Sequence, residues 1–254
     1  MRNILAIAQR EVRHYFTTPT GWLALCAFLV ITGFFFVLEV RWFAMESMET
    51  AYNPYREPLD LGAHLIAPFY GEISLILLMM CPALSMRLFA EDRRQRSFEL
   101  LLTSPVSTLE IVLGKYLGGM AFASLMVLST LHYALLLLWV GEPDIGVLFS
   151  AYLSVLLLVG AFMAVGLLTS AMTESQVVAL VLALAALLLF WALAAVGMIG
   201  GGPWSEALSE ASLFTHAEPM GRGVLRLRDL VYYGTFIGVF LFATHQRVEG
   251  IRWG

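Results

Sequence analysis

Charged residues are scarce in this chain, and their scarcity excludes most soluble folds. Only 13% of the residues are Asp, Glu, Lys or Arg, whereas soluble domains carry about 25%. Hydrophobic residues make up 59% of the chain, and the mean hydropathy is +0.80. This composition is typical of a polytopic membrane protein, whose spans need about 20 apolar residues each to cross roughly 30 Å of hydrocarbon.

Residues that would support enzyme or metal chemistry are also missing. Cys26 and Cys81 both fall within apolar runs, where cysteine is usually a small, inert hydrophobe, and they indicate neither a disulfide framework nor a metal site. The sequence contains no His-Glu-x-x-His and no Gly-x-Ser-x-Gly, and no aspartate lies in the core of an apolar run. An intramembrane enzyme is therefore disfavoured. The near absence of mid-span charges argues in the same way against an ion-coupled secondary carrier.

The long apolar runs predict an all-α fold with six transmembrane helices in a single transmembrane domain, residues 1–254. The first run is longer than the apolar region of a signal peptide (about 7–15 residues), and no clear cleavage site follows it, so we interpret it as a span. The predicted spans are about 21–40, 69–89, 112–139, 147–171, 176–199 and 229–245.

The distribution of basic residues favours a topology with both termini inside the cell, because inside segments are enriched in Lys and Arg. In this topology the inside segments carry Arg2, Arg10, Arg13, Arg87, Arg93, Arg94, Arg96, Lys115, Arg247 and Arg252. The outside segments carry fewer, namely Arg41, Arg56, Arg222, Arg226 and Arg228.

Residues 1–20 predict an amphipathic helix that lies in the inner membrane interface before the first span. Its apolar residues, Ile4, Leu5, Ala8, Val12, Tyr15 and Phe16, recur at helical spacing. Thr17-Thr18-Pro19 then ends the helix. We expect an elbow helix in which Arg10, Arg13 and Tyr15 are the candidate interfacial residues; an undistinguished cytoplasmic tail is the alternative.

Two segments are predicted to lie outside. Residues 41–68 contain Pro54, Pro58 and Pro68 and are predicted to form an external loop. Residues 200–228 begin with a glycine-rich stretch, and their pieces are too short and polar to cross the membrane. These pieces predict either half-embedded helices or a plain loop.

A dense charge cluster follows the second span. Burying its six charges at mid-bilayer would cost on the order of 15–20 kcal/mol at ~2.5–3.5 kcal/mol each, so residues 90–105 must be cytoplasmic. Ser97 can cap a short helix that Pro105 would end, with Phe98, Leu101 and Leu102 on one face and Glu99 off it. This apolar face would contact either a partner protein or the ends of its own spans. The charges are Glu91, Asp92, Arg93, Arg94, Arg96 and Glu99.

A short turn on the same side joins the fourth and fifth predicted spans. Thr173 and Gln176 have the spacing of a capping box. The shortness of this turn predicts that the two spans are antiparallel neighbours.

Several motifs resemble those of ABC-2-type export permeases, in particular the GldF/NosY-like permeases, and the resemblance covers nearly the whole chain. The most specific is Phe-Ala-Glu-Asp-Arg-Arg-Gln-Arg-Ser-Phe-Glu-Leu-Leu-Leu-Thr-Ser-Pro-Val-Ser (89–107) with Glu110-Ile-Val-Leu-Gly-Lys115. Gln-Arg-Glu-Val-Arg-His-Tyr-Phe (9–16), Thr-Glu-Ser-Gln (173–176) and Gly-Val-Leu-Arg-Leu-Arg-Asp (223–229) are also similar. The family usually has Gly-Thr where this chain has Arg96-Ser97, which keeps the capping hydroxyl and loses the glycine.

The resemblance implies a multi-pass inner-membrane subunit of an ATP-driven exporter. It implies a homodimer or a heterodimer with a related permease, two cytoplasmic ATPase subunits, an accessory protein outside the cytoplasm as a further candidate partner, and no nucleic acid. The helix at 98–103 would be a coupling helix. The residues implied to contact the ATPase are Phe98, Glu99, Leu101, Leu102, Thr173 and Glu174.

The chain itself lacks the phosphate-binding loop Gly-x4-Gly-Lys-Ser/Thr. Lys115 is the only lysine; Leu109 occupies the position of the first glycine and Tyr116 that of the magnesium-binding hydroxyl. We therefore expect no cofactor in this chain, no catalysis by the chain alone, and ATP and magnesium bound by the partner ATPase.

Three further interpretations remain open at this stage. His132, inside the third predicted span, is a candidate pathway residue or a packing residue. The pairs Gly114/Gly118 and Gly234/Gly238 are candidate sites of close helix approach, including a dimer contact. The chain could also transmit motion to an external partner without passing solute, and nothing in the sequence indicates the substrate.

Overall fold

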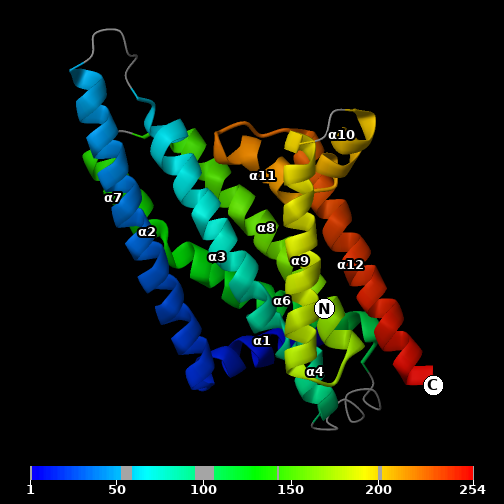
Figure 1. The fold of residues 1–254 in the computed structure, drawn as a ribbon. Helices are drawn as coiled ribbons and strands as arrows, with labels where there is room; N and C mark the ends of the chain where they lie inside the picture. The colour runs from blue at the N-terminus through cyan, green and yellow to red at the C-terminus, as the bar shows by residue number, and fades with distance from the viewer. Residues whose placement is uncertain (1, 53–58, 95–105, 142, 200–201, 254) are drawn as a thin grey trace.

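The computed structural model (Figure 1) describes residues 2–52, 59–94, 106–141, 143–199 and 202–253. Within these ranges the chain is helical and has no strand. Six helical stretches are long and apolar enough to cross a membrane. The prediction of an all-α protein with six spans is therefore confirmed.

The helices form a bundle with different structures at its two ends (Figure 1). At one end lie α1, α4 and the C-terminus, and at the other lie α10 and α11. The elements in chain order are α1 (Arg2–Thr17), α2 (Pro19–Ala51), the π-helical turn η1 (Gly62–Ile66), α3 (Ala67–Ser85), α4 (Arg87–Arg94), α6 (Thr108–Ser129), α7 (Leu131–Val140), α8 (Ile145–Met172), α9 (Gln176–Ile199), α10 (Pro203–Glu210), α11 (Leu213–Gly221) and α12 (Leu227–Trp253).

Helix α8 is the centre of the bundle, in contact with α3, α6, α9, α11 and α12. Small residues on α8 let its neighbours approach closely. The hydroxyl of Tyr116 on α6 donates a hydrogen bond to the carbonyl of Gly160 at 3.1 Å. A side chain at Gly166 would collide with Ser85 of α3. Since α8 has few exposed positions along its length, the other spans are arranged around it.

The predicted span boundaries agree best with the observed helix boundaries where the apolar run is flanked by turns. The fourth and fifth predicted spans, 147–171 and 176–199, coincide closely with α8 and α9. The prediction of a loop over 41–68 is wrong for residues 41–51, which continue α2 as helix, and for residues 62–68, which form η1 and the start of α3. The 41–51 stretch is rich in Met, Glu and Ala and contains neither Gly nor Pro, so helix propensity extends α2 beyond its apolar part. Helix α12 likewise continues past residue 245.

The third predicted span is one stretch with a break at Thr130. The hydroxyls of Ser129 and Thr130 donate to the carbonyls of Met126 and Val127, both at 2.6 Å. Such local bonds compete with the helical ladder. Thr130 also lies 3.2 Å from the hydroxyl of Tyr152 on α8, so this break is held against the central helix.

Within 202–228, the described part of the predicted external segment, the chain forms two helices rather than a plain loop. Ser212 caps α11 by accepting a hydrogen bond from the backbone N–H of Phe214 at 3.2 Å. His216 of α11 lies 2.7 Å from the carboxylate of Asp229, and both side chains are buried. The hydroxyl of Tyr233 donates to the carbonyl of Leu213 at 2.7 Å. These contacts fasten α11 to the start of α12.

The first glycine pair of the sequence brings α1 against α6 within the same chain. A Cβ at Gly114 would lie 2.7 Å from Ile7 Cβ, and one at Gly118 would lie 2.6 Å from Glu11 Cβ. Among the described residues, no neighbouring heavy atom lies within 4 Å of a Cβ at Gly234 or Gly238. The close approach predicted for Gly114 and Gly118 is thus made by α1, and this face of α6 is not free for a second subunit.

We predict that Gly118→Val destabilises the protein, whereas Gly234→Val, a matched control, has little effect. The added methyl groups at residue 118 would push α1 away from α6, and overpacking of this kind costs about 1–3 kcal/mol. Both substitutions have the same effect on intrinsic helix propensity. Thermal unfolding of the two variants in detergent measures the difference, and equal unfolding midpoints would contradict the observed contact.

Candidate functional site

Helix α4 follows a break in the second span and is capped by a side chain from α8. Pro82 inside α3 has no backbone N–H to donate to the preceding turn. Helix α3 ends with its C-cap four residues further on, at Met86. Ser170 on α8 accepts hydrogen bonds from the N–H groups of Phe89 and Ala90 at 3.0 and 3.1 Å and donates to the carbonyl of Met86 at 2.8 Å. One buried hydroxyl therefore holds the α3–α4 junction on the central helix.

The far end of α4 is tied to the turn between α8 and α9. The guanidinium of Arg93 donates to the carbonyl of Ala171 at 3.2 Å and to the carboxylate of Glu174 at 3.1 Å. The side chain of Glu174 is 67% exposed. The end of α4 and the turn at 173–176, which are far apart in sequence, thus form one surface.

The capping box predicted for Thr173 and Gln176 is wrong. Helix α9 begins at Gln176, and Ser175 accepts from the N–H of Val178 at 3.5 Å, which makes Ser175 the residue before the helix. Thr173 instead accepts from the N–H of Ser175 at 3.1 Å. Two nearby residues with capping side chains, Thr173 and Ser175, made the position of the cap ambiguous in the sequence.

A buried cluster of charges joins α1, α4 and α6. The ammonium of Lys115 on α6, whose side chain is 1% exposed, lies 2.9 Å from the Glu11 carboxylate on α1 and 2.6 Å from the Asp92 carboxylate on α4. Arg10 on α1 pairs with Glu11 at 2.9 Å and lies 3.6 Å from Asp92. These side chains form the α1–α4–α6 ion cluster, defined here as Arg10, Glu11, Asp92 and Lys115.

The cluster stabilises Glu11 in its charged form. Burial by itself raises the pKa of this carboxyl group, but the attraction and hydrogen bond of Lys115, with those of Arg10, outweigh burial and lower the pKa below its usual value. An unpaired buried ion costs several kcal/mol, so the two buried members, Glu11 and Lys115, depend on each other.

Tyr15 is the second anchor of α1. Its ring is buried and stacks on Phe122 of α6, with ring centres 4.4 Å apart. The guanidinium of Arg87 lies over the Tyr15 ring, 3.7 Å from the ring centre. The Tyr15 hydroxyl donates to the carbonyl of Leu84 at 2.9 Å. Burial raises the pKa of Tyr15 to about 12. Of the predicted interfacial residues, Tyr15 packs inward, Arg10 joins the ion cluster, and Arg13 is exposed.

The remaining predicted site residues are placed differently. Phe98, Glu99, Leu101 and Leu102 lie outside the described residues, so their predicted contact with an ATPase stays a prediction. His132 is exposed on the surface of α7, beside Tyr133, with Nδ1 2.6 Å from the carbonyl of Ser129. Its role in a pathway also stays a prediction.

Sequence reasoning missed Lys115, Glu11 and Asp92 as interacting residues. The available signal was Lys115 itself, the only lysine of the chain, which lies in the mostly apolar helix α6, in its N-terminal half. No group of three or more His, Cys, Asp and Glu side chains that could hold a metal occurs among the described residues.

A model of ABC-2 family transporter proteins matches residues 5–213 of the chain. The chain belongs to this family. The match includes α1, the ion cluster, α8 and the turn before α9. No curated protein matches the sequence significantly. Membership makes the chain a membrane permease subunit of an ABC transporter, a kind of subunit that is generally non-catalytic and that works with a cytoplasmic ABC ATPase.

We predict that Lys115→Met in this ABC-2 permease destabilises the bundle by about 3–5 kcal/mol. The substitution removes the buried cation between Glu11 and Asp92 and leaves only Arg10, whose side chain is 52% exposed, to pair with the buried Glu11 carboxylate. Arg10→Met is the matched control: its side chain is 52% exposed, so its loss should cost no more than about 1 kcal/mol. Thermal unfolding in detergent compares the two variants. A Lys115→Met protein as stable as Arg10→Met would show that the cluster does not anchor α1.

The same cluster predicts how stability depends on pH. The folded-state pKa of Glu11 is lowered, so its stabilising effect is complete above the unfolded-state value of about 4.3 and is lost as the pH falls through the folded-state pKa. Glu11→Gln should therefore be less stable than wild type at pH 7, and the gap should close at acid pH. Glu206→Gln, on the exposed side of α10, is the control. A gap independent of pH would contradict this role of Glu11.

Proposed function

We propose that the chain couples ATP hydrolysis by a separate cytoplasmic ATPase to the export of a substrate across the inner membrane. The observation that carries the proposal is the joining of four segments at one end of the bundle. The ion cluster connects α1, α4 and α6, and Arg93 connects α4 to the α8–α9 turn. A force applied to α4 would therefore reach several spans together.

The coupling contact is proposed for the surface that includes the end of α4 and the turn at 173–176. Residues 95–105 follow α4 directly in the chain, so a partner that pushes on Phe98, Leu101 or Leu102 also pushes on α4. Glu174 offers an exposed carboxylate on the same surface. In this proposal ATP and magnesium are held by the ATPase, α1 is the elbow helix in the inner interface, and both termini are cytoplasmic.

A second permease subunit, either another copy or a related chain, is part of the proposal. Helices α2, α9 and α12 are mostly unburied within the chain and carry large exposed apolar side chains, such as Phe34, Leu189 and Phe242. These faces would contact lipid or the second subunit. We also propose the GldF/NosY-like subtype, on the motifs at 9–16, 89–115 and 223–229.

Transmission of motion to an external protein, without passage of solute, is the second candidate function. It is favoured by the length of α2, which has 33 residues and would measure about 50 Å at 1.5 Å per residue, well over the roughly 30 Å of hydrocarbon. ATP-dependent uptake of solute into inside-out vesicles supports export. Its absence, in vesicles that hydrolyse ATP, supports mechanical transmission.

We predict that Leu101→Asp and Glu174→Lys each abolish co-purification of an ATPase encoded beside this chain and co-expressed with it. Leu101→Asp places a charge on the proposed apolar docking face, and Glu174→Lys reverses the exposed charge of the turn. Trp204→Asp is the matched control, since Trp204 is exposed on α10 at the opposite end. Membrane insertion of each variant is checked by fractionation.

Loss of at least tenfold in bound ATPase for the first two variants, with full binding by Trp204→Asp, is the expected result. Equal binding by all three inserted variants would exclude this surface as the docking site. Failure of the wild-type chain to bind any neighbouring ATPase would remove the support for the proposed coupling.

A further inference from the structure

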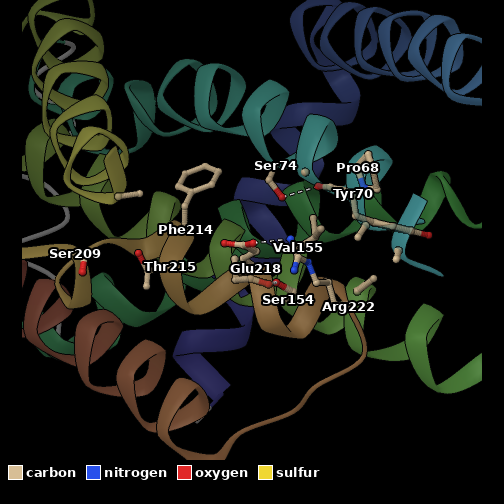
Figure 2. Close-up of a pocket in the computed structure, with 17 residues that line it drawn as sticks. Pro68, Tyr70, Ser74, Ser154, Val155, Ser209, Phe214, Thr215, Glu218 and Arg222 are labelled. Carbon is tan, nitrogen blue, oxygen red and sulfur yellow. Dashed lines mark hydrogen bonds and ion pairs between the residues drawn. The ribbon is translucent and has the colours of Figure 1, made fainter. Parts of the chain in front are cut away.

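A cavity of about 580 Å³ lies at the α10–α11 end of the bundle, and no step of the proposed coupling uses it. Its walls come from η1, α3, α8, α9, α10 and α11 (Figure 2). The wall from Ala67 to Ser74 covers about 10 Å at 1.5 Å per residue, which is shorter than half of the hydrocarbon core, about 15 Å.

The inner wall of the cavity is apolar in effect. Alanines and Gly71 make up much of it. Its serine hydroxyls are used within the protein: Ser74 donates to the carbonyl of Tyr70 at 2.7 Å, and Ser154 donates to that of Ala217 at 3.1 Å. Apart from the hydroxyl of Tyr70, which also lines the cavity, water bound at this wall would find few hydrogen-bond partners. An aliphatic chain is therefore a better occupant than solvent.

The mouth of the cavity carries one ion pair. The guanidinium of Arg222 donates to the carboxylate of Glu218 at 2.8 Å, and their side chains are 62% and 60% exposed. Figure 2 shows both side chains extending from α11 toward Val155 and Ser154. An exposed pair of this kind contributes little net stability, so a ligand that supplies both opposite charges can replace it at small cost.

We propose that this cavity binds one zwitterionic phospholipid with a primary ammonium headgroup, phosphatidylethanolamine. The phosphate pairs with Arg222, because guanidinium groups bind phosphate through charge-assisted hydrogen bonds. The ammonium pairs with Glu218, and the first part of an acyl chain fills the apolar wall. In the orientation proposed above, the lipid comes from the outer leaflet. The site does not depend on the ATPase or on the transported substrate.

Substitution of glycine by leucine tests the cavity with a matched control. In the part of the chain that the structure describes, a Cβ at Gly71 or at Gly238 meets no heavy atom within 4 Å, so both sites accept a side chain. Of these two glycines, only Gly71 lines the cavity. Native mass spectrometry of protein purified from phosphatidylethanolamine nanodiscs should show one retained lipid per chain in wild type and Gly238→Leu. Retention should fall at least fivefold in Gly71→Leu; equal retention in all three proteins would overturn the proposal.

Headgroup recognition is tested separately, with Glu218→Gln and Arg222→Gln in nanodiscs of phosphatidylethanolamine, phosphatidylcholine or phosphatidylglycerol. Wild type should retain phosphatidylethanolamine at least fivefold better than the other two, and each variant should lose this preference. Retention of all three lipids alike by wild type would overturn the proposed recognition. Soluble phosphorylethanolamine should not displace the lipid; displacement at equal concentration would identify a site for small solutes instead. The lipid-retention and displacement measurements do not depend on ATPase binding, so their failure would leave the proposed coupling untouched.

Discussion

The buried ammonium of Lys115 constrains the arrangement of the whole α1–α4 end. A lysine that is 1% exposed persists only when its charge is compensated, since an uncompensated ion in the interior costs several kcal/mol. Its two carboxylate partners come from α1 and α4, which are separate segments. Any arrangement that moves either helix away leaves charges unpaired, so the ion cluster specifies where both helices lie relative to α6.

The ion pairs also require close contact between backbones, and α6 provides it. Gly114 and Gly118 flank Lys115 on the same helix, and α1 lies directly against both glycines. A larger residue at either position would hold α1 too far out for Glu11 to reach Lys115. Close packing and charge pairing therefore support each other: the glycines permit the approach, and the ion cluster makes it specific.

Sequence alone predicted the spans and missed the contacts between them, for a physical reason. Apolar length determines whether a helix crosses the bilayer, and α8 and α9 followed their apolar runs closely. The extent of α2 depended instead on helix propensity beyond the apolar part, which hydropathy does not report. The pairing of Lys115 with Glu11 and Asp92 depends on which helices become neighbours, and no single-sequence pattern states that. For the candidate site, the sequence located the charge cluster and the turn at 173–176, whereas the Arg93–Glu174 contact between them required the fold.

The two ends of the bundle are connected by one helical path. Helix α3 lines the cavity between Ala67 and Ser74, and at its other end it leads through the break at Met86 into α4, which belongs to the ion cluster. A break normally allows one helix to bend without moving the other. Here Ser170 binds groups on both sides of the break, at Met86 and at Phe89, so α3 and α4 are held to the same point of α8. One hydroxyl on the central helix therefore fixes the position of α4 relative to α3, and with it the position of the Asp92 carboxylate relative to the cavity-lining part of α3.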